Sequence, residues 1–141
     1  MKVTEGLLTE HRLLKILATQ LESAAESKGE LPMLVGAASM LQKALIDHSR
    51  VEDDGLFARL EAAMGGGGGP VAVMRADHEQ IEGMLGEIAD GTNRDQVART
   101  VREVVGLTRD HFAKEENILF PMAEQVLDEK ALEDLSAPWK V

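Results

Sequence analysis

Apolar residues recur every three or four positions along most of this chain, and this spacing most strongly limits what it can fold into. The period of two that marks β-strands is missing, and aromatic residues, which strands favour, make up only 3% of the sequence. Glycine and proline interrupt the helical pattern at three places. The sequence therefore predicts an all-α fold with helices at about residues 4–28, 32–64, 70–90 and 95–128 and a C-terminal tail at 129–141.

The three interruptions have the composition of turns. The first surrounds Gly29, the second is a run of five glycines at 65–69, and the third contains Thr92 and Asn93, either of which can cap the next helix. Long helices joined by short connections favour neighbours that run in opposite directions. We therefore expect one domain over residues 1–141, an antiparallel up-down-up-down four-helix bundle.

Composition excludes several classes of function. The chain has no cysteine, which excludes disulfides, thiolate metal sites and cysteine nucleophiles. Its formal charge of -10 disfavours binding to nucleic acid. No run of eighteen apolar residues is present, so we expect no membrane span, and acidic Glu5 and Glu10 interrupt any signal-peptide core. The expected location is the cytoplasm.

An internal repeat carries many of the ionisable residues. A shift of 63 residues superimposes His48-x-x-x-Glu52 on His111-x-x-x-Glu115, together with the residues that follow each pair. Each pair lies on an otherwise apolar helical face, because residues four apart are neighbours on a helix. Two such halves suggest a site with approximate two-fold symmetry.

Two further histidines, His11 and His78, each follow an acidic residue and lie alone on the apolar faces of their helices. In antiparallel neighbours, residues equally far from the shared turn lie at the same depth. This rule places all four histidines in one transverse layer, and the two glutamates join it. The expected metal-binding residues are His11, His48, Glu52, His78, His111 and Glu115.

Four imidazoles and two carboxylates need partners in an apolar core, since unpaired buried carboxylates cost several kcal/mol. Two cations that share bridging glutamates and take two imidazole nitrogens each would remove this cost. Nitrogen and oxygen ligands with open positions suit non-haem iron, with manganese or zinc as competitors. The open positions would accept a small diatomic or peroxide ligand. No catalytic residue is assigned.

Other acidic residues near these motifs are interpreted differently. Glu82, one helical turn beyond His78, is left open as a metal ligand, a group bound through water, or a solvent-facing side chain. Asp53, Asp54 and Glu116 are expected to be solvated surface charges.

Three aromatic residues stand out in a chain that has so few. Phe57 and Phe120, which the repeat superimposes, are expected to cap the core beside the site. Trp139 is expected to dock on the bundle, and no functional role is assigned to it.

With these motifs in place, the chain resembles the hemerythrin-like family of His/His/Glu cation-binding domains from about Glu10 to Leu127. The resemblance implies an antiparallel four-helix bundle that holds two iron ions in an oxo- or hydroxo-bridged centre. Members bind O2, sense O2 or redox state, handle NO or peroxide, or assist iron–sulfur repair. The motifs that carry the resemblance are Glu10-His11, His48-x-x-x-Glu52, Asp77-His78 and His111-x-x-x-Glu115-Glu116-x-x-Leu119-Phe120-Pro121.

Two departures from the family's oxygen carriers matter. Those proteins have a fifth histidine one turn beyond the third-helix histidine, where this chain has Glu82. They also end on a histidine followed by a more distant aspartate, where this chain has Glu115 at the fourth position. With only four histidines in the chain, a five-histidine set cannot form. These differences argue against reversible oxygen carriage and for a more open or carboxylate-richer site.

The expected function is a di-iron protein that binds or senses O2, NO or related small oxidants. One alternative is a di-iron enzyme acting on peroxide, NO or ferrous iron, and another is an iron donor for iron–sulfur cluster repair. A metal-free bundle that binds a partner helix is a fourth hypothesis, which the lack of a large exposed apolar stripe disfavours. Whether the chain is an enzyme, its protein partners and its oligomeric state are left open.

Overall fold

The computed structural model describes residues 1–140, and every regular element in that range is helical, which confirms the all-α prediction. Gln96 donates its backbone N–H to the Asn93 side chain at 3.0 Å, so Asn93 caps the last of the long helices. The four long helices are α1 (Val3–Glu26), α2 (Leu31–Arg50), α4 (Gly69–Ala89) and α5 (Arg94–Lys114).

Two of these helices continue through a wider π-helical stretch. In each case the stretch begins at, or one residue before, a glutamate of the sequence repeat, Glu52 or Glu115. Single π-helical turns within α-helices often occur at functional sites. The continuations are η1 (Val51–Phe57) and α3 (Ala58–Ala63) after α2, and η2 (Glu115–Leu119) and α6 (Phe120–Val126) after α5.

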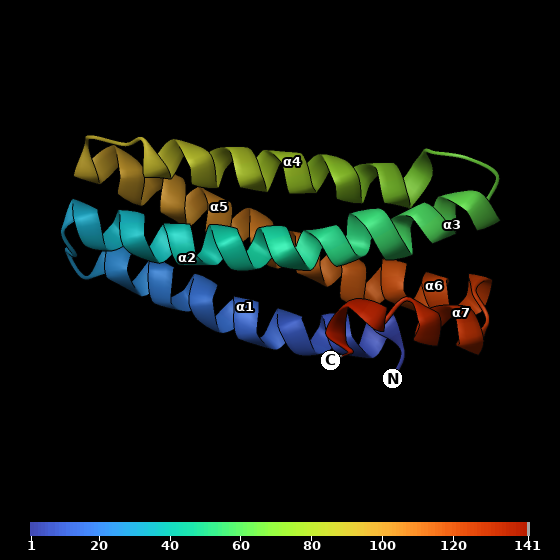
Figure 1. Cartoon of the computed structure of the whole chain (residues 1–141). Helices are drawn as coiled ribbons and strands as arrows, with labels where there is room; N and C mark the ends of the chain where they lie inside the picture. Colours follow the sequence, from blue (N-terminus) through green and yellow to red (C-terminus); the bar gives the residue numbers. More distant parts are fainter. Residues whose placement is uncertain (141) are drawn as a thin grey trace.

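The long helices lie side by side, and successive ones are joined at alternate ends of the molecule (Figure 1). Helix α1 packs against α2 and α5, and α4 packs against the same two helices. Arg94 ties two of the turns together, because its guanidinium donates to the backbone carbonyls of Gly29 and Ala25. At the opposite end, Gly65, Gly66 and other residues of the five-glycine loop adopt positive φ, which glycine tolerates best.

The buried apolar residues form two clusters, separated by a layer of buried polar side chains. One cluster lies toward the Gly29 turn and contains Leu21, Leu41 and Val101 among others. The other lies toward the glycine loop and contains Leu7 and Leu60 among others. The polar layer between them is held at a fixed depth by packed apolar residues on both sides.

The C-terminal segment, expected as a plain tail, is helical. It forms α7 (Glu129–Asp134) and the short 3-10 helix η3 (Ala137–Trp139), and α7 packs against α1. Leu132 is buried in the second apolar cluster, and Trp139 packs against that cluster, which confirms the expected docking. Within residues 1–140, no helix combines the length and the apolar run that crossing a bilayer would require.

Candidate metal centre

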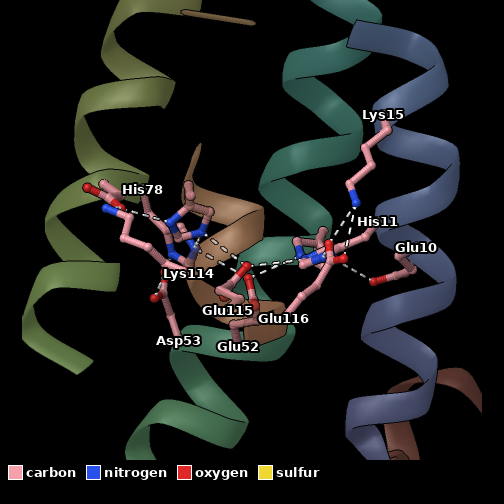
Figure 2. Close-up of polar contacts among 12 residues, drawn as sticks. Glu10, His11, Lys15, Glu52, Asp53, His78, Lys114, Glu115 and Glu116 are labelled. Carbon is pink, nitrogen blue, oxygen red and sulfur yellow. Dashed lines mark hydrogen bonds and ion pairs between the residues drawn. The ribbon is translucent and has the colours of Figure 1, made fainter. Parts of the chain in front are cut away.

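The polar layer contains the six residues expected to bind metal. All six residues are at most 4% exposed, although they come from four different helical runs. Figure 2 shows His11 and His78 pointing toward Glu52 and Glu115 from opposite sides. The structure therefore brings together every residue of the predicted set.

The six residues form two groups of four. The first tetrad is His11, His48, Glu52 and Glu115, and the second tetrad is His78, His111 and the same two glutamates. Within each tetrad, the candidate ligand atoms all lie within 4.8 Å of one another. Two cations bridged by shared carboxylates would require this arrangement.

Each glutamate faces one histidine of each tetrad. Glu52 Oε1 lies 3.1 Å from His48 Nε2 and 3.3 Å from His78 Nε2. Glu115 Oε1 lies 3.2 Å from the Nε2 atoms of both His11 and His111. Donors at about 2.1 Å from one cation and at right angles to each other are about 3.0 Å apart, so these separations are close to those of neighbouring ligands.

The glutamate oxygens and the histidine Nε2 atoms at the centre of this layer are better matched as ligands of metal ions than as hydrogen-bond partners of one another. Both oxygens of Glu52 and Glu115 are buried without a hydrogen-bond partner, as are the Nε2 atoms of His11 and His48. Leaving such groups unpaired in a protein core is costly. A cation in each tetrad would satisfy all of them with the donor types that iron, manganese and zinc accept.

The outer nitrogen of every histidine contacts a carboxylate from a neighbouring helical run. We call these four residues the outer carboxylates. An Nδ1–H that donates to a carboxylate leaves the Nε2 lone pair directed inward, as a metal-binding imidazole requires. The pairs are His11 with Glu116 (2.8 Å), His48 with Glu10 (2.8 Å), His78 with Asp53 (2.9 Å) and His111 with Asp77 (3.0 Å).

These contacts correct one prediction from the sequence. Asp54 is exposed as expected, but the expectation that Asp53 and Glu116 are solvated surface charges is wrong. Each directly follows a buried glutamate within a π-helical stretch, and one step along the helix turns the side chain away from the direction of that glutamate. That turn directs it toward the histidine of the adjacent helix rather than into solvent. The repeat contained the signal, because it superimposes Asp53 on Glu116.

Three of the outer carboxylates also contact a cation. Lys15 Nζ lies 2.9 Å from Glu116, Arg75 lies 3.5 Å from Asp53, and Lys114 Nζ lies 2.6 Å from Asp77. Burial alone would raise the pKa values of Glu116 and Asp77, but hydrogen bonds from the neighbouring lysine and histidine lower both. Glu116 and Asp77 are therefore charged acceptors for the protons of His11 and His111 at neutral pH.

Aromatic rings cover the histidines. Phe57 stacks on His78 with 5.5 Å between ring centroids, and Phe120 lies 5.5 Å from His11, so both flank the site as predicted. Phe112 stacks more closely on His11, at 3.9 Å, and was not anticipated from the sequence, because the repeat pairs it with Ser49 and not with a second aromatic residue. The three rings exclude water from much of the layer.

A small cavity reaches the layer between α2 and α4. Its volume is about 10 Å³, which is close to the smallest space that holds one water molecule. Glu82 lines this cavity but belongs to neither tetrad, and burial raises the pKa of its carboxyl. The other lining residues are Leu45, His48, Ser49, His78, Ile81, His111 and Phe112.

Without metal, the layer holds protons in place of cations. Burial would lower the pKa of His48, but the charge of Glu52 and hydrogen bonding to Glu10 raise it to about 10. His78 behaves similarly: burial opposes its charge, yet contacts with Asp53 and Glu52 raise its pKa to about 10. Burial and the nearby Glu52 charge raise the pKa of Glu115. A metal ion must therefore displace protons as it binds.

Comparison with known proteins gives two findings. Residues 2–133 match the family model described as the hemerythrin HHE cation binding domain. The chain is also 28% identical over 119 residues to proteins named iron–sulfur cluster repair protein YtfE, from Escherichia coli O157:H7, E. coli K12 and Shigella boydii. These alignments cover 75% of this chain and 54% of each relative, so the chain spans about half the length of the curated relatives it matches. No solved structure matches the chain significantly.

Proposed function

The chain belongs to the hemerythrin HHE cation-binding family, and from that premise we propose that it is a non-haem di-iron protein that binds or senses O2, NO or related small oxidants. The proposal includes two iron ions per chain, one in each tetrad, with Glu52 and Glu115 bridging them. It also includes the antiparallel four-helix topology and the cytoplasmic location expected from the sequence.

The observation that carries this proposal is the set of buried donors without hydrogen-bond partners. Glu52 and Glu115 face histidines of both tetrads, and none of their four oxygens has a hydrogen-bond partner. In a layer closed by apolar clusters on both sides, cations are the partners that match carboxylate and imidazole donors together.

Bound iron would supply open coordination positions and a change of oxidation state, and the chain's own residues set the conditions for both. The outer carboxylates hold the proton on each Nδ1, which keeps each Nε2 available. The phenylalanine rings limit the access of water. The cavity between α2 and α4 touches His48, His78 and His111, and its size favours a diatomic or similarly small ligand.

The names of the relatives favour a second candidate, an iron donor for iron–sulfur cluster repair. They are called iron–sulfur cluster repair proteins, and this chain matches them over 75% of its length. A di-iron enzyme acting on peroxide, NO or ferrous iron is the third candidate. Iron transfer to an apo-protein acceptor would favour the donor, and turnover well above that of free iron would favour the enzyme.

The direct test is anaerobic loading with Fe(II), removal of loosely bound iron, and analysis of iron per chain. We expect about two ions per chain, with near-ultraviolet charge-transfer absorption that appears on exposure to air and changes with NO. Glu79→Gln is a matched control, because Glu79 is an exposed glutamate on the helix that carries His78. Iron content near zero in the wild-type chain, or absorption that responds to neither gas, would contradict the proposal.

A further inference from the structure

Trp139, which the sequence analysis left without a role, lies directly on the backbone of α1. A Cβ atom built on Gly6 would come within 2.5 to 2.9 Å of three atoms of the indole ring. The ring therefore occupies space that any larger residue at position 6 would fill. The short helix η3 and the buried Leu132 of α7 hold this end of the chain against the bundle.

From this position, Trp139 reaches the candidate metal centre through one intermediate residue. The indole Nε1–H donates to Glu10 Oε2 at 3.1 Å. The other oxygen, Glu10 Oε1, lies 2.8 Å from His48 Nδ1. Both oxygens of the carboxylate are thus engaged, which fixes the plane of Glu10 and, through it, the orientation of the His48 ring.

This corner differs from the other three corners of the layer. The remaining outer carboxylates contact Lys15, Arg75 or Lys114, whereas Glu10 has no lysine or arginine in ion-pair contact within residues 1–140 and makes its only such contact with His48. An indole donates a hydrogen bond without carrying a charge. Trp139 therefore holds Glu10 in place without the lysine or arginine that lies beside each of the other outer carboxylates.

We propose that Trp139 is a positioning residue for His48, so that docking of the C-terminal segment sets the metal affinity of the first tetrad and not that of the second. This inference rests on the proposed di-iron function. The indole orients Glu10, and Glu10 orients His48 and increases the electron density of its ring. The C-terminal segment thus contributes to the metal centre without supplying a ligand.

The principal experiment compares the wild-type chain with Trp139→Phe, which keeps an aromatic ring over Gly6 and removes the N–H donor. Fe(II) is titrated anaerobically against a competing chelator, to give separate dissociation constants for the two ions. We expect one ion to bind about tenfold more weakly, at the lower end of the range for outer-sphere partners, and the other to be unchanged. Circular dichroism and thermal unfolding of the metal-free chains check that the fold is intact.

A double-mutant cycle tests whether Trp139 acts through Glu10. If it does, Trp139→Phe adds no further weakening to Glu10→Gln, since the two changes break one pathway. Asp77→Asn is the matched control, because Asp77 contacts His111 of the second tetrad. In the Asp77→Asn background, Trp139→Phe should still weaken the binding of one ion by the full amount.

A second variant displaces the indole without replacing Trp139, so it checks that the effect comes from the position of the ring and not from the substitution itself. Gly6→Ala leaves the indole in the chain but places a methyl group where the ring lies. Trp139 is the only tryptophan and the chain has no tyrosine, so intrinsic fluorescence reports on this ring alone. We expect a red-shifted emission together with the same weakening of one ion.

The outcomes separate this inference from the proposed function. A wild-type chain that binds no iron overturns both. A wild-type chain that binds two ions, with equal weakening of both ions or of neither in Trp139→Phe, overturns the positioning role alone. The positioning role is supported if Trp139→Phe weakens the binding of one ion in the wild-type background and has no such effect in the Glu10→Gln background.

Discussion

The two tetrads have both glutamates in common, and every histidine of either tetrad contacts an outer carboxylate of its own. The groups around those outer carboxylates differ between the tetrads. In the second tetrad, both outer carboxylates contact a cation, Arg75 or Lys114. In the first tetrad, one contacts Lys15 and the other contacts only the Trp139 indole outside the layer. The inner donors and the outer carboxylates thus correspond between the two tetrads, while the groups that contact those carboxylates differ.

Access differs between the tetrads as well. Phe112 and Phe120 cover His11, and the small cavity touches His48 but not His11. In the second tetrad, both His78 and His111 line that cavity. Two sites with nearly the same donors can therefore differ in how readily an external ligand reaches them.

The largest loss of iron is expected from replacing a glutamate that belongs to both tetrads. Glu52 faces a histidine of each tetrad, so Glu52→Gln should remove most of the iron from both positions rather than from one. Iron analysis after chelator washing, beside the exposed control Glu79→Gln, measures this loss. A Glu52→Gln chain that keeps one full equivalent of iron would mean that the carboxylate serves only one tetrad.

Replacing a histidine should separate the tetrads. His48→Ala removes a donor from the first and His111→Ala from the second, so each should reduce iron from about two ions per chain to about one. Because a metal that binds only the folded state stabilises it, each variant should also lose part of the rise in melting temperature that iron gives the wild type. Full iron content with unchanged melting in either variant would contradict the ligand assignment.

An intermediate effect is expected from pH. Raising the pH should lower the stability of the metal-free chain and increase its affinity for iron. The pKa of His48 is raised from 6.5 to about 10. Its protonated form therefore stabilises the metal-free fold fully below pH 6.5, and this contribution is lost as the pH rises through about 10. Iron must displace that proton, so iron affinity should increase over the same range.

Thermal unfolding with chelator and iron titration, each followed from neutral to alkaline pH, measure the two trends. Both tetrads should follow them, because the pKa of His78 is also raised to about 10. A melting temperature of the metal-free chain that rises with pH, or iron affinity that falls before hydroxide precipitation, would be inconsistent with protonated histidines in the metal-free chain.

The smallest effect is expected at Glu82. This residue lines the cavity but lies in neither tetrad, so Glu82→Ala should leave iron content and metal-free melting close to wild type. Any change should appear in the rate at which NO alters the absorption of the loaded protein. Loss of one iron equivalent would instead identify Glu82 as a ligand.

Much of the candidate site could be predicted because helical periodicity fixes both face and depth. The four-residue spacing of His48 and Glu52, with its copy at His111 and Glu115, gave the inner donors directly. The all-helical fold followed from the same periodicity. These features depend on local geometry, which a sequence encodes well.

What the sequence did not reveal depends on contacts between helices. Asp53 and Glu116 look like surface acids on their own helices, and only packing directs them to His78 and His11. The π-helical stretches at Val51–Phe57 and Glu115–Leu119 also left no recognisable pattern. The role proposed for Trp139 required knowing where a distant segment comes to rest.

The central claim is that two cations occupy the two tetrads, and anomalous diffraction from crystals of the iron-loaded chain tests it most directly. We predict two iron peaks per chain, one bounded by His11 and His48 and the other by His78 and His111, with Glu52 and Glu115 reaching both. A single peak, or iron bound only at the surface with the six side chains left as they are, would contradict the account.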